Sequence, residues 1–145
     1  KRYDVPRIIF VNKLDRMGAD PWMAIEEPEI DWIKLRSCVI NIGVENGLEG
    51  VVDLVRWKAA YFDGDSGEIV REVDIPEDLI EFATEKKLEL LSCLAECGDE
   101  AMEEYYLDEN INVPEEELKA CIRKNTLSLE FSPVFLGSAY KNKGV

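Results

Sequence analysis

Residues 7–15 have the sequence Arg-Ile-Ile-Phe-Val-Asn-Lys-Leu-Asp, in which a short apolar run stops abruptly at polar side chains. Because β-branched and aromatic residues dominate the run, it predicts a buried strand that ends at Asn12. In open α/β sheets, ligands bind outside the carboxyl ends of the strands. Asn12, Lys13 and Asp15 are therefore candidates for a ligand site. An Asn-Lys-x-Asp string is also typical of a polar turn that caps a helix, so a second signal is needed.

That second signal lies near the other end of the chain. Residues 133–137, Pro-Val-Phe-Leu-Gly, predict another buried strand, and Ser138 and Ala139 follow it directly. If the two strands belong to one parallel sheet, their carboxyl ends share one edge. The two polar segments would then form a single site.

The groups at these two strand ends match the edge of a guanine base. Guanine presents N1–H and N2 amino donors side by side, which Asp15 can accept together, while the O6 acceptor needs a donor such as the Ala139 backbone N–H. Ser138 could orient the Asp15 carboxylate, Asn12 could reach N7, and the stem of Lys13 could cover the base face. Adenine presents the opposite pattern. The five residues together predict a pocket for guanine.

The segment between the two apolar runs has its own β-then-α pattern. From Asp20 a helix is predicted through Arg36, but because Pro28 would break its interior, two shorter pieces fit equally well. Pro76 and Pro114, each followed by acidic residues, predict two further helix starts, the first helix running for about six turns. Four β-rich runs separated by turn residues predict a small antiparallel sheet: 38–42, 50–55, 58–63 and 68–73.

Charge is distributed unevenly along the 145 residues. The net charge is −14, and residues 37–131 hold 8 basic and 24 acidic groups, whereas the flanks together carry +2. Such a field repels phosphate backbones and attracts basic partners, so direct nucleic-acid binding by the middle is not expected. A solvated acidic face explains the same charge. No apolar run approaches the ~20 residues of a membrane helix, and residues 1–6 lack the apolar core of a secretory signal.

The metal-binding side chains are sparse. The chain has no histidine and four cysteines, Cys38, Cys93, Cys97 and Cys121, without a CxxC pair. Cys93 and Cys97 share one face of a predicted helix, but nothing completes a zinc site. Reduced, mostly buried thiols in a reducing compartment are the expectation.

Two motifs resemble those of the translational GTPases, and specifically of elongation factor G. Residues 12–18, Asn-Lys-Leu-Asp-Arg-Met-Gly, are similar to the fourth GTPase motif of that family. Residues 137–145, Gly-Ser-Ala-Tyr-Lys-Asn-Lys-Gly-Val, are similar to its fifth motif with a family-specific extension. Three segments between them resemble a subdomain inserted in the family's GTPase domain: 42–45, 50–54 and 74–76. Leu14 and the segments 61–64 and 133–136 favour the organellar branch.

The resemblance implies an α/β fold. We expect a partial P-loop-type GTPase domain, two parallel strands with a helix, that carries an inserted α+β subdomain with a small antiparallel sheet. Residues 1–36 would be the part of the GTPase domain with the guanine-recognition motif, residues 37–131 the acidic insert, and residues 132–145 the last strand and fifth motif. GTP or GDP would be held through Asn12, Lys13, Asp15, Ser138 and Ala139.

The parts that hydrolyse GTP are not in this sequence. It contains no G-x-x-x-x-G-K-[ST] phosphate loop and no switch segments to hold Mg²⁺ and the attacking water. In the family these parts precede the fourth motif, so we expect a fragment of a longer protein, cut before Lys1 and after Val145. No catalytic and no metal-binding residue is expected here, and the isolated chain should be inactive as a GTPase.

The resemblance also implies a setting for the full-length protein. It would be the ribosomal translocase of mitochondrial protein synthesis in the matrix, a cytoplasmic location being the alternative. Its partners would be the ribosome, including a stalk protein met by the acidic insert, and the remaining domains of the same protein, without a membrane or a specific nucleic-acid sequence. Two alternatives stay open: an acidic protein-binding module without nucleotide, and a related GTPase such as a mitochondrial ribosome-recycling factor.

Overall fold

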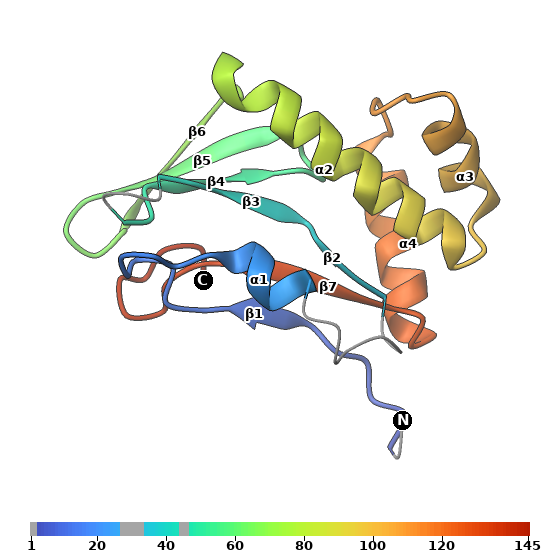
Figure 1. The fold of residues 1–145 in the computed structure, drawn as a ribbon, viewed down its shortest axis with the longest axis horizontal. Coiled ribbons are helices and arrows are strands. Elements are labelled where there is room, and N and C mark those ends of the chain that lie inside the picture. The colour runs from blue at the N-terminus through green and yellow to red at the C-terminus, as the bar shows by residue number, and fades with distance from the viewer. Residues whose placement is uncertain (1–2, 27–33, 44–46) are drawn as a thin grey trace.

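The computed structural model describes residues 3–26, 34–43 and 47–145 (Figure 1). Its first sheet has three parallel strands in the order β1-β7-β2: β1 (Ile9–Val11), β7 (Phe131–Leu136) and β2 (Lys34–Ser37). β1 and β7 are the two apolar runs predicted as strands, and they pair in register with Val11 opposite Leu136. Both strands therefore end at the same edge of the sheet, and the predicted α/β class is confirmed.

The second sheet is antiparallel and has four strands in sequence order. The four β-rich runs of the sequence form it, as predicted: β3 (Val39–Ile42), β4 (Gly50–Asp53), β5 (Lys58–Asp63) and β6 (Ile69–Val73). Alternate residues of β3 and β4 face opposite layers, because side chains alternate along a strand. Val39 and Val51 pack toward the parallel sheet. Ile40 and Val52 pack toward α2 (Glu77–Glu96) on the opposite face.

One extended segment joins the two sheets. The N–H of Cys38 donates to the Val134 carbonyl of β7 at 2.9 Å, and the Cys38 carbonyl accepts from Leu54 at 3.0 Å. The predicted helix is accordingly wrong over β2, although α1 (Pro21–Glu26) forms its first part. The sequence Lys-Leu-Arg-Ser suits a helix locally, and pairing with β7 overrides that preference. The segment around Pro28 lies outside the described residues.

Three helices cover the antiparallel sheet and one end of the molecule. α2 (Glu77–Glu96) begins after Pro76 and α4 (Glu115–Leu127) after Pro114, both with acidic first turns, as predicted. α3 (Glu100–Leu107) was not predicted; its N-cap is Asp99, whose carboxylate accepts the Met102 N–H at 3.3 Å. Figure 1 shows α2 crossing the antiparallel sheet on the side away from the parallel sheet.

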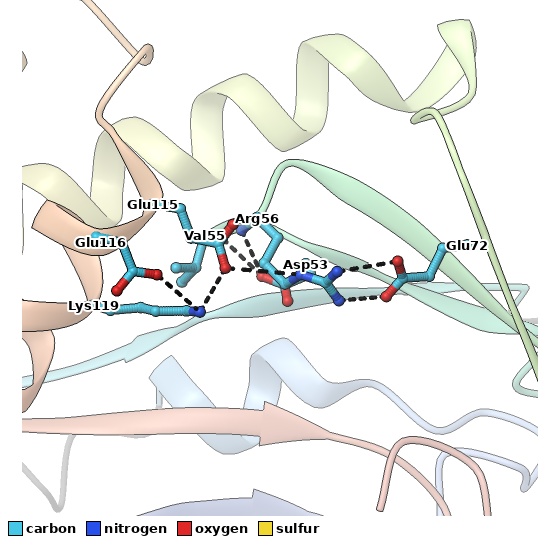
Figure 2. Close-up of polar contacts among 7 residues, drawn as sticks. All are labelled: Asp53, Val55, Arg56, Glu72, Glu115, Glu116 and Lys119. Atoms are coloured by element: carbon cyan, nitrogen blue, oxygen red, sulfur yellow. Dashed lines mark hydrogen bonds and ion pairs between the residues drawn. The ribbon is translucent and has the colours of Figure 1, made fainter.

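An ion-pair network ties the β4–β5 turn to α4 (Figure 2). The Asp53 carboxylate accepts the backbone N–H of Arg56 at 3.0 Å and shapes the turn. The Arg56 guanidinium pairs with both carboxylate oxygens of Glu72 and lies 3.9 Å from Glu115, which in turn pairs with Lys119 at 2.5 Å. β6, the turn and the start of α4 are therefore linked by charge at this end of the sheet.

The described residues form neither a disulfide nor a metal-ligand cluster. None of the four cysteines, all of which lie in the described part of the chain, forms a disulfide. Burial raises the pKa of Cys38 to about 12, so its thiol stays protonated at neutral pH. Within residues 3–26, 34–43 and 47–145, no three His, Cys, Asp or Glu residues are grouped to hold a metal ion. In the same part of the chain, every helix is too short or too polar to span a bilayer.

Candidate functional site

The loops that follow β1 and β7 are tied together by their backbones. The Gly137 N–H donates to the Val11 carbonyl at 3.0 Å, and the Leu14 N–H donates to the Gly137 carbonyl at 3.2 Å. A Cβ on Gly137 would come within 2.5 Å of the Lys143 carbonyl oxygen and 2.7 Å of the Phe10 ring, so glycine is required for this approach. The five predicted site residues therefore lie at one edge of the parallel sheet.

Asp15 and Ser138 are joined by a short hydrogen bond. The Ser138 hydroxyl donates to Asp15 Oδ1 at 2.5 Å and accepts the Lys141 N–H at 3.3 Å. Ser138 is fully buried, so its side chain holds a single position. This hydrogen bond, with the backbone of Asp15 and the charges of Arg16 and Lys141, lowers the pKa of the Asp15 carboxyl, although desolvation opposes it. Asp15 is consequently an ionised acceptor at neutral pH.

Asn12 bridges the two loops. Its Oδ1 accepts the N–H of Lys13 at 2.8 Å and the N–H of Ala139 at 2.9 Å. With Oδ1 engaged twice, the Nδ2 group is the part of this amide that can donate to a ligand. The Ala139 N–H was expected to face a ligand acceptor, and in the structure it is directed at Asn12. A ligand acceptor at Ala139 would therefore have to share or replace that bond.

Lys13 occupies the turn between Asn12 and Asp15. Its φ is +67°, a left-handed conformation that is uncommon for a residue with a side chain. The carbonyl of Lys13 accepts the Arg16 N–H at 3.2 Å, and Leu14, the second residue of this turn, is buried in the core. The Lys13 side chain is exposed, so its stem is available to lie along a flat ligand.

Sequence reasoning missed a contact behind the site. The Lys143 ammonium donates to the Leu48 carbonyl at 2.8 Å, and the β5–β6 turn at Gly67 approaches the backbone of Asn142. From the sequence, Lys143 was assigned no role beyond its place in the motif of residues 137–145. The available signals were the motif's second lysine and the glycine-rich turn, but only the fold brings them together.

The site can recognise one edge of a polar ring. It offers the ionised carboxylate of Asp15, an amide donor from Asn12 and a backbone N–H at Ala139. A ring edge with two adjacent donors and a flanking acceptor fits these groups. The same residues include no group of the kind that binds phosphates in a glycine-rich loop.

Comparisons with known proteins agree with the motifs. No family model matches the chain. Over an alignment of 149 residues it is 43% identical to mitochondrial elongation factor G-1 of Arabidopsis thaliana, which covers 100% of this chain and 19% of that protein. A solved structure from Thermus thermophilus superposes with a TM-score of 0.77 at 24% identity, covering 99% of this chain and 21% of that one, and so supports the fold. The resemblance to elongation factor G is confirmed, and the chain spans about a fifth of the relative's length.

Proposed function

We propose that this chain, similar over its whole length to a segment of elongation factor G, is the part of a translational GTPase that recognises the guanine of GTP and GDP. The observation that carries the proposal is the 2.5 Å hydrogen bond between Ser138 and Asp15, which joins residues 123 positions apart. A buried hydroxyl that orients a carboxylate at a strand edge is suited to reading a base. Residues 1–36 and 132–145 contribute the site, and residues 37–131 are the insert.

Base reading follows from the hydrogen-bonding groups. Asp15 accepts N1–H and the N2 amino group of guanine, and Ser138 holds the carboxylate in the orientation that this requires. Asn12 donates from Nδ2 to N7, and the Ala139 N–H donates to O6 once it leaves Asn12 Oδ1. The stem of Lys13 covers one face of the ring. These assignments rest on donor and acceptor matching.

Adenine is rejected by the same groups. Its N1 is an acceptor that faces the Asp15 carboxylate, and its 6-amino group is a donor that faces the Ala139 N–H. Two acceptors or two donors that face each other in a partly buried site are both left without a partner, and each unpaired group costs more free energy than a typical matched hydrogen bond gains. Base selection is therefore a property of these two loops.

Hydrolysis belongs to the rest of the full-length protein. Phosphoryl transfer depends on positioning and charge stabilisation by a phosphate loop, switch segments and Mg²⁺. The described residues do not fit Mg²⁺, because they contain no cluster of ligating side chains. In the whole protein, GTP would order the switches and hydrolysis on the ribosome would release them. This chain contributes the base contacts, and alone it would not hydrolyse GTP.

The setting we propose is the mitochondrial ribosome. The similarity to a mitochondrial elongation factor supports the compartment, with the matrix as the site of protein synthesis. The net charge of −16 on residues 37–131 would attract a basic surface of a ribosomal stalk protein. The other domains of the same protein are the remaining partners.

A second candidate function is an acidic module that binds a basic protein and no nucleotide. The charge of residues 37–131 favours it. Guanine nucleotide binding by this chain within the full-length protein separates the two candidates. A related translational GTPase, such as a ribosome-recycling factor, would share the base site and differ in the domains beyond it.

The decisive experiment replaces Asp15 with asparagine in the full-length protein. The amide offers one acceptor and one donor, so one guanine donor loses its partner and GTP affinity should fall at least ~5-fold. Xanthine carries a carbonyl oxygen where guanine has its amino group and matches the new donor. We therefore expect preference to move from GTP toward XTP in a competition assay with ribosome-stimulated hydrolysis as readout.

The matched control is Asp108→Asn at the exposed C-terminal end of α3, which removes the same charge on an element that contributes nothing to the site. It should leave the GTP preference unchanged. If Asp15→Asn keeps the full preference for GTP, Asp15 does not read the base and the proposal fails.

A further inference from the structure

We propose that the antiparallel sheet of the insert positions the base-reading loop of residues 137–144, with Lys143 as the positioning residue. The inference rests on the proposed function and goes beyond it, because it assigns the insert a part in nucleotide selectivity. The contacts that carry it come from the β3–β4 connection at Leu48 and the β5–β6 turn at Gly67. Neither belongs to the two motifs that read the base.

The first contact is a chain of hydrogen bonds that ends at the base-reading carboxylate. The half-buried Lys143 ammonium donates to the Leu48 carbonyl at 2.8 Å. The backbone of Lys143 pairs with Ser138 in both directions, at 2.8 and 3.0 Å. Ser138 then donates to Asp15 at 2.5 Å. Leu48 is therefore linked to Asp15 through two intermediate residues.

The second contact is steric. Gly67 has φ +60°, and a Cβ there would lie 2.8 Å from the Asn142 carbonyl oxygen and 3.1 Å from that of Lys141. Both neighbours are backbone atoms, which cannot rotate away as the end of a side chain can. A side chain at Gly67 would have to displace the loop that carries Ser138 and Ala139.

The first base-reading loop also rests on the insert. Leu14 and Leu48 are 6% and 2% exposed and belong to one buried cluster with Val51 of β4. Gly47 faces the backbone of Asp15, since a Cβ on it would come within 3.6 Å of the Asp15 carbonyl oxygen. Both halves of the base site are thus supported from the same side by the insert.

A positioning role differs measurably from simple packing. Packing alone would lower the free energy of unfolding and leave the folded molecules with normal selectivity. Displacement of the loop would weaken the Asp15 contact with the N2 amino group in folded molecules. The ratio of GDP to IDP affinity isolates that contact, because inosine lacks the amino group.

The test compares two glycines of one turn in the full-length protein. Gly67→Ala pushes on the loop backbone. Gly64→Ala shares the backbone strain, with φ +88°, but the three atoms nearest to its new Cβ all belong to the Glu68 carboxylate, which is the end of a flexible side chain. We expect Gly67→Ala to weaken GDP binding about tenfold and to lower the GDP-to-IDP ratio, and Gly64→Ala to leave the ratio unchanged. Lys143→Met should lower the same ratio, and Lys143→Arg, which can still donate to Leu48, should restore most of it.

The outcomes separate this inference from the proposed function. If the unmodified protein does not prefer GDP over ADP, the proposed function fails and this inference falls with it. If the protein prefers GDP but Gly67→Ala and Gly64→Ala have equal GDP-to-IDP ratios, only the positioning role is wrong. Should Gly67→Ala not fold, Lys143→Met decides alone, and an unchanged ratio for it overturns the inference.

Discussion

The two ends of the antiparallel sheet are attached to the rest of the molecule in different ways. At the end near the candidate site, Leu48 is 2% exposed, and Gly67 of the β5–β6 turn lies so close to the loop of residues 137–144 that a Cβ would clash with its backbone. At the opposite end, Arg56 and Glu72 form an ion pair with side chains 43% and 44% exposed. One end is held by close packing and the other by charge in contact with water.

The two kinds of contact differ in how firmly they fix the geometry of the sheet. Exposed ion pairs contribute little to stability, since water and salt screen them and two long side chains must be ordered. Close-packed groups cannot move without opening a void or a clash. The close-packed contact at Leu48 and Gly67 therefore lies beside the candidate site, whereas the exposed ion pair of Arg56 and Glu72 lies at the far end of the sheet.

The largest effect should come from Leu48→Ala. The change removes a buried side chain beneath both base-reading loops but keeps the carbonyl that accepts from Lys143. We expect the free energy of unfolding to fall by roughly 2–5 kcal/mol in urea titrations. Leu107→Ala, at a side chain 70% exposed on α3, is the control and should change little. Equal effects of the two variants would mean that Leu48 is not part of a close-packed contact at the site.

A smaller effect is expected from Ser138→Ala, and it depends on pH. Without the hydroxyl donor, GDP affinity at neutral pH should fall about 5- to 10-fold. The lowered pKa of Asp15 keeps the carboxylate charged above that pKa, and guanine binding is lost as pH falls through it. In Ser138→Ala this pKa rises toward its ordinary value of 3.8, so binding should be lost at a higher pH than in the unmodified protein.

The pH profile of GDP affinity checks this prediction. Ser132→Ala, at another buried serine of β7, is the matched control and should keep the original profile. Coinciding acid limbs for Ser138→Ala and the unmodified protein would mean that the hydroxyl does not stabilise the ionised Asp15.

The smallest effect should follow Arg56→Met at the charged end. Because the pairs with Glu72 and Glu115 are exposed, the melting temperature should drop by about 2 °C or less, and the difference should vanish at roughly 1 M salt. Arg123→Met changes the charge equally on exposed α4 surface and serves as control. A loss as large as that of Leu48→Ala would show that the network is a rigid attachment after all.

Local patterns predicted the parts of the fold that are locally determined. The β-branched runs at residues 38–42 and 50–55 form strands, because strand preference depends on side chains within a few residues. Pro76 and Pro114 precede helices, because proline lacks the backbone N–H that a residue inside a helix would use. The two polar strand ends were found in the same way. Their meeting required only that β1 and β7 be parallel neighbours.

The rest depends on contacts between distant segments. Residues 34–37 have helix-favouring side chains, and only β7 beside them makes them a strand. The helix after Asp99 is short and was hidden between two longer predicted ones, although Gly98, the Asp99 cap and acidic residues behind it were a usable signal. The hydrogen bond from Lys143 to the Leu48 carbonyl joins residues 95 positions apart, and no local sequence pattern predicts it.

The central position of β7 in the parallel sheet has a consequence during synthesis. Within the described chain, β1 and β2 pair only with β7, which is made last. Asp15 leaves the ribosome 123 residues before Ser138, so at roughly 5–20 residues per second it waits roughly 6–25 s for its partner. Until then the parallel sheet cannot form, and any earlier folding of the insert takes place without β7. A chain that stops before Phe131 would retain nearly the whole insert but would lack β7 and the Ser138 partner of Asp15.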